Sequence, residues 1–412
     1  MGRPKIVHRP GMCQTGRATS WAWPSRAGCV LIGAMKPTLA FVAASLLALV
    51  GPSLSGCKGE PASSGGPPHE AVDPDDPASC APCHGAIVAE WSASMHAQAH
   101  EDPIFTAMRA MRAGREGEAV GKACEGCHSP RVAARGVTCA ACHASAPVGE
   151  RGGLIAGPSD LARGLTPAHG TGPAAPGIKD GSGACMRCHE KLANPTGVSI
   201  CTTGIEWREH AEKAGGEAKP CASCHMPVTP GPGTVTGKRT EHKAHRFVGP
   251  HARWAEGEVA LEPLALALRF EGAALVATLT NLTGHTFPTG FPARMAVLEL
   301  VGRDRSGAEV WRNFAKNPMA EAPDAVLNKV FYDDKGEPTI APWSVKLARD
   351  TTLKAGEARE VRVAVPEAVV RVEARALMRL VAPTLADKLG LAKDPLATPR
   401  PVAKASATRP AP

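Results

Sequence analysis

Five short segments of this chain share one spacing of cysteine and histidine. In each segment two residues separate two cysteines, and a histidine follows the second cysteine directly. The segments are Cys80–His84, Cys124–His128, Cys139–His143, Cys185–His189 and Cys221–His225. Zinc ribbons and disulfide frameworks also use cysteine pairs at this spacing, but neither requires the adjacent histidine.

This spacing is that of covalent c-type haem attachment. Two thiols bond to the vinyl groups of one porphyrin, and the histidine binds the iron from the proximal side. We therefore expect five covalently attached haem c groups. The attaching cysteines are Cys80, Cys83, Cys124, Cys127, Cys139, Cys142, Cys185, Cys188, Cys221 and Cys224, and the proximal ligands are His84, His128, His143, His189 and His225.

The second axial position of each iron separates two functions. A histidine there gives a six-coordinate iron suited to electron transfer, whereas an empty position gives a reactive iron. Candidate distal ligands are His96, His245, His285, His169 and His210, with His100, His242 and His251 in reserve and His69 the weakest. Any of them could instead be a surface or structural histidine. Met95, Met186 and Met226 are further possible ligands, although methionine is also common packing material.

The elements around the motifs are predicted to be short. Helix-forming residues without Gly or Pro predict helices over 86–99 and 205–214, and both contain a Glu-Trp pair beside a haem motif. Residues 144–183 are rich in Gly, Pro and Ala without a period, which predicts a loop organised by the haems.

After residue 257 the composition changes. Apolar residues alternate with polar ones over 264–270, 275–279, 361–365 and 370–376, which favours an antiparallel β-sandwich. The expected fold is mixed: a mainly helical and loop multihaem cytochrome domain followed by a β-sandwich domain. A short helical stretch over 385–391 leads into a tail that we expect to be disordered.

The N-terminal part has the features of an export signal. A positive start at Met35 and an apolar run over 39–50 precede Cys57, in a context similar to a bacterial lipobox. Ordinary secretion, with Cys57 as a bystander, is the alternative. The expected organisation is an upstream extension not native to the protein (1–34), a lipoprotein signal peptide (35–56), a flexible tether (57–79), a pentahaem cytochrome c domain (80–257), a β-sandwich (258–383) and a disordered tail (384–412).

Charge and aromatic content bear on nucleic-acid binding and on how the haem half folds. The formal net charge is +8, but residues 1–56 contain six Lys/Arg and no acid, and no basic stripe predicts nucleic-acid binding. Aromatic residues make up 4% of the chain, so the haem half should fold around its porphyrins. Cys201 lies outside the motifs and is expected to be a small buried residue, with a reactive or iron-binding thiol as the alternative.

The haem half resembles a known family, the multihaem c-type cytochromes typified by the tetrahaem electron carriers of ammonia-oxidising bacteria. The matching residues are Cys80–His84, Glu90-Trp91, Ser94, His96-Ala97, Asp102-Pro103, Phe105, Cys124–Pro130 and Gly136–His143. In that family the histidine of the Trp-x-x-Ser-x-His pattern is a distal ligand, which implies this role for His96. Segments 206–249 and 281–290, with Asp350-Thr351, look like the end of the haem domain and the accompanying sandwich in related proteins.

Two functions follow from these observations. The first is an exported, periplasmic or outer-membrane lipoprotein of a Gram-negative bacterium that carries electrons among cytochromes or quinol-linked complexes. The second is a haem-dependent oxidoreductase that acts on a small nitrogen or sulfur oxide at one five-coordinate haem. All five motifs keep their histidine, and Tyr332, the single tyrosine, lies outside the haem half, so the carrier is favoured and no catalytic residue is assigned.

Overall fold

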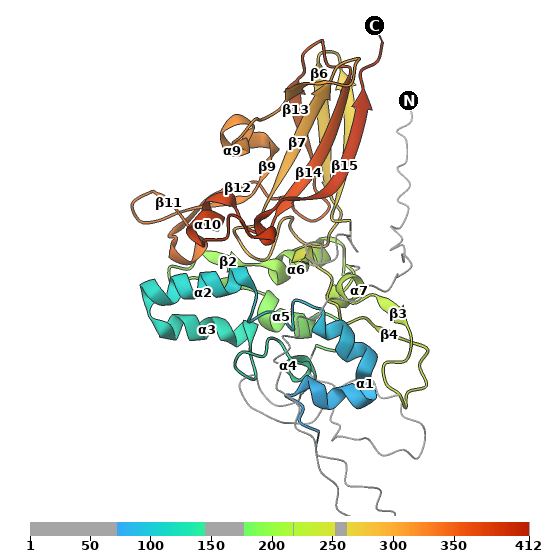
Figure 1. Cartoon of the computed structure of the whole chain (residues 1–412), viewed down its shortest axis with the longest axis vertical. Helices are drawn as coiled ribbons and strands as arrows, with labels where there is room; N and C mark the ends of the chain where they lie inside the picture. Colours follow the sequence, from blue (N-terminus) through green and yellow to red (C-terminus); the bar gives the residue numbers. More distant parts are fainter. Residues whose placement is uncertain (1–71, 145–176, 217, 252–261, 412) are drawn as a thin grey trace, which may run out of the picture. The chain divides into compact units, whose positions relative to one another are not determined.

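The computed structural model describes residues 72–144, 177–216, 218–251 and 262–411. The helices are α1 (Pro77–Ser92), α2 (Pro103–Glu116), α3 (Glu118–His128), α4 (Cys139–His143), α5 (Gly183–His189), α6 (Thr203–Lys213), α7 (Cys221–His225), α9 (Pro318–Glu321) and α10 (Pro383–Lys388), with 3-10 helices η1 (Pro323–Ala325), η2 (Ala341–Trp343) and η3 (Pro395–Ala397) (Figure 1). None of the described helices has the length and apolar character needed to cross a membrane. The expected extension, signal peptide, Cys57, most of the 144–183 loop and the 257/258 boundary lie outside the described residues.

Helix α1 differs from the helix expected over 86–99. It begins at Pro77, where the Asp76 side chain accepts a hydrogen bond from the backbone N–H of Ala78, and it ends at Ser92. An Asp cap followed by proline is a strong helix start, because proline has no N–H to leave unsatisfied there. The first haem motif therefore lies inside α1.

The expected tether is also shorter than 57–79. Asp75 is fully buried, and its Oδ1 lies 2.5 Å from Nε of Arg131. This ion pair and the start of α1 fix the residues directly before the first motif. The sequence contains too little apolar surface here to predict order, and the order comes from a partner distant in the chain.

Each haem motif forms about one helical turn. Helices α3, α4, α5 and α7 all end at the motif histidine, and in α1 the backbone leaves helical geometry at His84. A helical turn brings side chains three and four positions apart onto one face. Both cysteines and the histidine of a motif can therefore meet one porphyrin.

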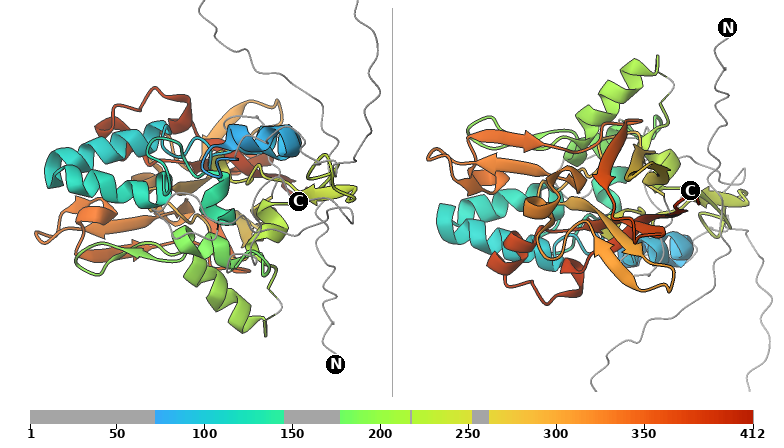
Figure 2. Two further views of the ribbon diagram at one scale, coloured as in Figure 1. Left: turned by 90° about the horizontal axis from the view of Figure 1, so that it is seen from below. Right: turned by 90° about the horizontal axis from the view of Figure 1, so that it is seen from above.

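The strands are antiparallel throughout. They are β1 (Leu192–Ala193), β2 (Ser199–Cys201), β3 (Val228–Pro230), β4 (Glu241–Lys243), β5 (Leu264–Glu271), β6 (Ala274–Asn281), β7 (Met295–Arg303), β8 (Glu309–Arg312), β9 (Val326–Leu327), β10 (Lys329–Tyr332), β11 (Pro338–Thr339), β12 (Lys346–Asp350), β13 (Ala358–Ala364), β14 (Arg371–Arg379) and β15 (Arg400–Thr408). The larger sheets have the orders β13-β6-β5 and β15-β14-β7-β8, with β9 paired to β7. Two views of the same ribbon are given in Figure 2.

One apolar core joins these two sheets. Leu275 of β6 and Leu300 of β7 are both fully buried in it, together with Val372 of β14 and Val361 of β13. Alternation of apolar and polar residues along each strand gives the sheet one buried face. The C-terminal region is therefore a pair of antiparallel sheets that share their apolar faces.

The expectation of a disordered tail over 384–412 is wrong for most of it. Helix α10 begins at Pro383, and β15 pairs with β14 from Arg371 to Met378. Val402 is buried in the common core, while Lys404 on the same strand is exposed. The segment is rich in alanine and proline, so its sequence shows no clear alternation of apolar and polar residues. Pairing with β14 is what orders it.

Contacts join the haem half to the strands. Ile104 of α2 is buried with Leu380, Val381 and Leu385 near the C-terminus. The side chain of buried Asn194 donates from Nδ2 to the carbonyl oxygens of Ala341, the first residue of η2, at 3.0 Å and of Ser344, directly after η2, at 2.7 Å. Burial of polar groups is tolerated when their hydrogen bonds are made, so these contacts fix the two parts together.

Candidate haem-binding site

Three motif histidines each face a second histidine. The ring centres are 6.4 Å apart for His189 and His96, 6.2 Å for His143 and His245, and 6.4 Å for His225 and His285. The interplanar angles are 49°, 29° and 15°. In the sequence the partners lie far apart or in different halves of the chain.

This separation fits a metal between the rings. Imidazole nitrogen binds first-row metals at about 2 Å, so two imidazoles on opposite sides of one iron have ring centres about 6 Å apart. Rings in van der Waals contact would lie closer together. The residues therefore fit three haem irons with two histidine ligands each.

The protonation of the rings also fits iron binding. The Nδ1 atoms of His84, His128 and His225 lie 2.7, 3.0 and 2.6 Å from the carbonyl oxygens of Gly233, Ala99 and Val248. A carbonyl only accepts, so each Nδ1 carries the proton and Nε2 keeps its lone pair for a metal.

The facing histidines have the same arrangement. Nδ1 of His245 lies 2.8 Å from the carbonyl oxygen of Lys243, and Nδ1 of His285 lies 2.9 Å from that of Thr286. Burial, and then the charge of His143, lowers the pKa of His245 to about 4. These rings are therefore neutral at physiological pH, the form that binds metals.

The backbone of His96 packs against the residues that lead into the third motif, while its ring faces His189 of the fourth. Burial, followed by the charge of His189, lowers the pKa of His96 to about 4. The backbone N–H of Val137 donates to the carbonyl oxygen of His96 at 2.7 Å. Gly136 has φ +64°, and a Cβ atom there would lie 2.6 Å from the same oxygen. This close approach requires glycine.

Cysteines of different motifs lie next to one another. The thiols of Cys80 and Cys139 lie close enough to shift each other's pKa, as do those of Cys185 and Cys221 and those of Cys127 and Cys188. The first motif thus adjoins the third, and the fourth adjoins both the fifth and the second. This spatial order differs from the order in the sequence.

The other two motifs lack such a partner in the described part of the chain. No histidine ring described there faces His84 or His128 at the separation of the three pairs. The ring of His128 instead stacks on Phe105, with centres 3.9 Å apart. Beside this motif, Nδ1 of His251 lies 3.5 Å from Oδ2 of Asp102.

The remaining candidates occupy different surroundings. His242 lies 3.3 Å from a carboxylate oxygen of Glu90, and His210 lies beside Gly284. Nδ1 of His100 is buried without a partner among the described groups. His169 and His69 fall outside the described residues. Of the methionines, Met186 is buried against Gly204.

Sequence reasoning did not assign roles to two glutamates. Glu90 accepts a hydrogen bond from the backbone N–H of His245 at 2.8 Å. Glu206 accepts one from the hydroxyl of Thr289 at 2.6 Å, in the loop that carries His285. The repeated Glu-Trp pair was the signal that could have identified both.

Comparisons with known proteins were made for the whole chain. No protein-family model and no curated protein matches it. It is similar to a solved structure, the penta-haem cytochrome c552 from Thermochromatium tepidum, with 27% sequence identity and a TM-score of 0.63. The match covers 80% of this chain and 97% of that chain.

The similarity supports a multihaem c-type cytochrome. It agrees with the five attachment motifs and with haem c as the cofactor. The ten motif cysteines and the five histidines that follow them would hold the porphyrins, which supply one-electron redox chemistry when bound.

Proposed function

We propose that the protein is an exported multihaem c-type cytochrome that carries electrons between redox partners through five closely packed haems. Its partners would be other cytochromes or quinol-linked complexes. The observation that supports this most strongly is the set of three facing histidine pairs at 6.2 to 6.4 Å. Two histidine ligands leave no position for a substrate and favour low-spin iron that exchanges electrons.

The second support for electron transfer is that the five haem motifs lie close to one another. Thiols that shift each other's pKa place the first motif beside the third, the second beside the fourth and the fourth beside the fifth. Porphyrins attached at these cysteines would lie near one another, as rapid electron transfer requires. Nη1 of Arg187, in the fourth motif, donates to the carbonyl oxygen of Ala141, in the third, at 3.1 Å. The contacts therefore connect the first motif to the fifth.

Export and the anchor belong to the same proposal. Attachment of c-type haem takes place outside the cytoplasm, and the apolar run before Cys57 has the form of a lipoprotein signal. Lipidation at Cys57 would hold the protein at a membrane, with the periplasm or outer membrane as the location. The paired C-terminal sheets would form a β-sandwich, since they share one core.

Low-temperature electron paramagnetic resonance of the oxidised holoprotein tests the carrier. Histidine pairs predict low-spin signals, and mass spectrometry should find five haems on the mature chain. A high-spin signal that changes when nitrite or hydroxylamine is added would contradict a pure carrier.

A second function is supported by the surroundings of the second motif. Asp102 is buried beside His251, and His100 near the same motif has a buried Nδ1, while burial raises the pKa of Asp102. Groups of this kind can supply protons to a small bound oxide. The alternative is therefore a haem-dependent oxidoreductase that acts on a nitrogen or sulfur oxide at this haem, and the same spectrum would reveal it.

A further inference from the structure

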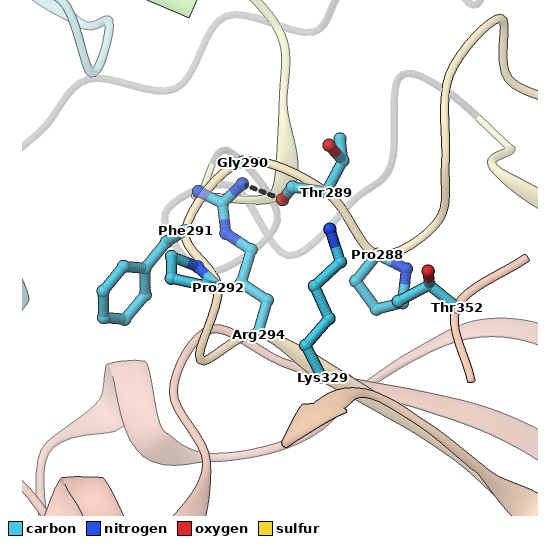
Figure 3. Close-up of a pocket in the computed structure, with 8 residues that line it drawn as sticks. All are labelled: Pro288, Thr289, Gly290, Phe291, Pro292, Arg294, Lys329 and Thr352. Carbon is cyan, nitrogen blue, oxygen red and sulfur yellow. Dashed lines mark hydrogen bonds between the residues drawn. The ribbon is translucent and has the colours of Figure 1, made fainter. Parts of the chain in front are cut away.

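Arg294 lies just before β7, and the charge of Asp102 acts on it from beyond ion-pair distance. Its Nη1 donates to the carbonyl oxygen of Thr289 at 2.9 Å (Figure 3). Its Nε is enclosed and has no hydrogen-bond partner among the described residues. No carboxylate in the described part of the chain forms an ion pair with it. Burial lowers the pKa of the guanidinium.

The surroundings of Arg294 are those of the haem ligands. Thr289, which accepts from Arg294, lies four residues after His285, and its hydroxyl lies 2.9 Å from that of Thr203. Gly204, the next residue, packs against the backbone of His189. His189 belongs to the fourth motif and His285 faces the fifth. The guanidinium thus binds the loop that carries His285, and this loop contacts the helix packed against the fourth motif.

A second cation lines the same pocket but is already paired. Nζ of Lys329 lies 3.6 Å from a carboxylate oxygen of Glu206. Figure 3 shows the Arg294 and Lys329 side chains directed toward the turn at Thr289. Removal of a charge from water costs several kcal/mol unless a counter-charge compensates it. Among the described residues no carboxylate lines this pocket or forms an ion pair with Arg294, so the guanidinium can still bind one.

We propose that Arg294 is the binding site for a haem propionate, on the porphyrin held by the fourth or the fifth motif. The proposal rests on the proposed haem content. A carboxylate matches the two-pronged guanidinium geometry, and each porphyrin carries two carboxylates. A free oxyanion has the same chemistry, but the neighbouring haem ligands favour the propionate.

Redox potentiometry of the Arg294→Met holoprotein tests this site. Loss of a positive charge next to a haem favours the more positive oxidised iron, so one haem should titrate at a lower potential while the others keep theirs. Arg294→Lys keeps the charge and should restore most of the potential if the methionine variant folds poorly. Arg303→Met, at the other end of β7 and paired with Glu373, is the control.

Three outcomes would overturn the proposal. The first is unchanged potentials in Arg294→Met, and the second is an equal shift in Arg303→Met. The third is a saturable response of the wild type to nitrite or sulfate that Arg294→Met abolishes, which would assign the site to a free anion. Mass spectrometry counts the haems of the wild type and of every variant. Fewer than five haems on the wild type would contradict the proposed function and not the Arg294 site alone.

Two tryptophans bind the chain just before two of the haem motifs. Nε1 of Trp91 donates to the carbonyl oxygen of Val137 at 2.8 Å, and Nε1 of Trp207 donates to that of Lys219 at 3.0 Å. Each acceptor lies two residues before the first cysteine of a motif, Cys139 or Cys221. The tryptophans therefore hold the segments that lead into the third and fifth motifs.

The preceding glutamates hold the facing ligands of the same two motifs. Glu90 binds the backbone of His245, which faces His143, and Glu206 binds the loop of His285, which faces His225. In each case the first cysteines of two motifs also lie close enough to shift each other's pKa, Cys80 with Cys139 and Cys185 with Cys221.

We infer that the chain contains two copies of one two-haem unit, in which a Glu-Trp pair positions both axial ligands of the second haem. The first copy joins the first and third motifs, and the second joins the fourth and fifth. Glu90 and Glu206 are positioning residues, because they contact ligand segments rather than iron. This inference also rests on the proposed haem content.

Paramagnetic resonance of single variants tests the two-unit arrangement. Glu90→Gln should change one low-spin signal, and Glu206→Gln should change a different one, because each releases a different distal segment. Glu209→Gln, on the exposed side of α6, and Ser92→Ala, on α1, should change none. If both glutamine variants altered the same signal, or neither altered any, the inference would be wrong. Trp91→Phe and Trp207→Phe provide a second pair that keeps the ring packing.

Discussion

The imidazole rings of His143 and His245 lie 6.2 Å apart, centre to centre, and are inclined by 29°. His143 ends α4, and His245 follows β4 in a segment that Glu90 holds by its backbone. A short helix, a small hairpin and a carboxylate from α1 therefore converge on one gap of iron-binding size.

Replacement of His245 tests this gap directly. In His245→Ala the third haem should lose its distal ligand and change from low-spin to high-spin, which paramagnetic resonance and the visible spectrum would detect. His210→Ala is the informative comparison, since His210 lies beside Gly284 and no described motif histidine faces it. We expect that variant to keep every low-spin signal. A new high-spin signal in it would restore His210 as a ligand.

The buried pair of Asp75 and Arg131 makes a prediction about stability. Asp75→Asn leaves the guanidinium buried without its counter-charge, which should lower the free energy of unfolding by roughly 3–5 kcal/mol. Asp76→Asn removes an exposed pair with Arg135 but keeps a good helix cap, so it should cost at most about 1 kcal/mol. Guanidinium denaturation of both holoproteins measures the difference. Equal losses of unfolding free energy in the two variants would show that the buried ion pair contributes no more than the exposed one.

Acidification should weaken one contact between α2 and η2. A hydrogen bond from Arg112, with another from Trp343, holds the pKa of Glu116 below its usual value of 4.5. A lowered folded pKa gives stability that is present above the usual pKa and is lost as the pH falls through the lowered one. The stability advantage of the wild type over Glu116→Gln should therefore shrink in acid. An advantage that stays constant down to that pH would exclude this linkage.

The last strand, β15, should contribute to the stability of the protein, as a disordered tail would not. Deletion of residues 399–412 removes β15 and exposes the edge of β14, so the denaturation midpoint should fall and aggregation should rise. Val402→Asp should destabilise in the same direction, because Val402 is buried in the common core. Lys404→Asp, at an exposed position of the same strand, is the control. A truncated protein as stable as the full chain would support the expectation that residues 399–412 are disordered.

The sequence determined the local chemistry. A C-x-x-C-H motif contains both attachment cysteines and the proximal histidine within one helical turn, so its function needs no information from elsewhere in the chain. Alternating residues likewise indicated β5, β6, β13 and β14, because a half-buried strand repeats every two residues. Helix α6 was predicted to within two residues for the same local reason.

Only the tertiary structure decided which residues meet. The partner of His189 is His96, and that of His225 is His285, and no spacing in the sequence encodes either distance. The order of α1 before the first motif depends on Arg131, and that of β15 depends on β14. These features depend on burial and hydrogen bonds between distant segments, whose free energy appears only when the chain is folded.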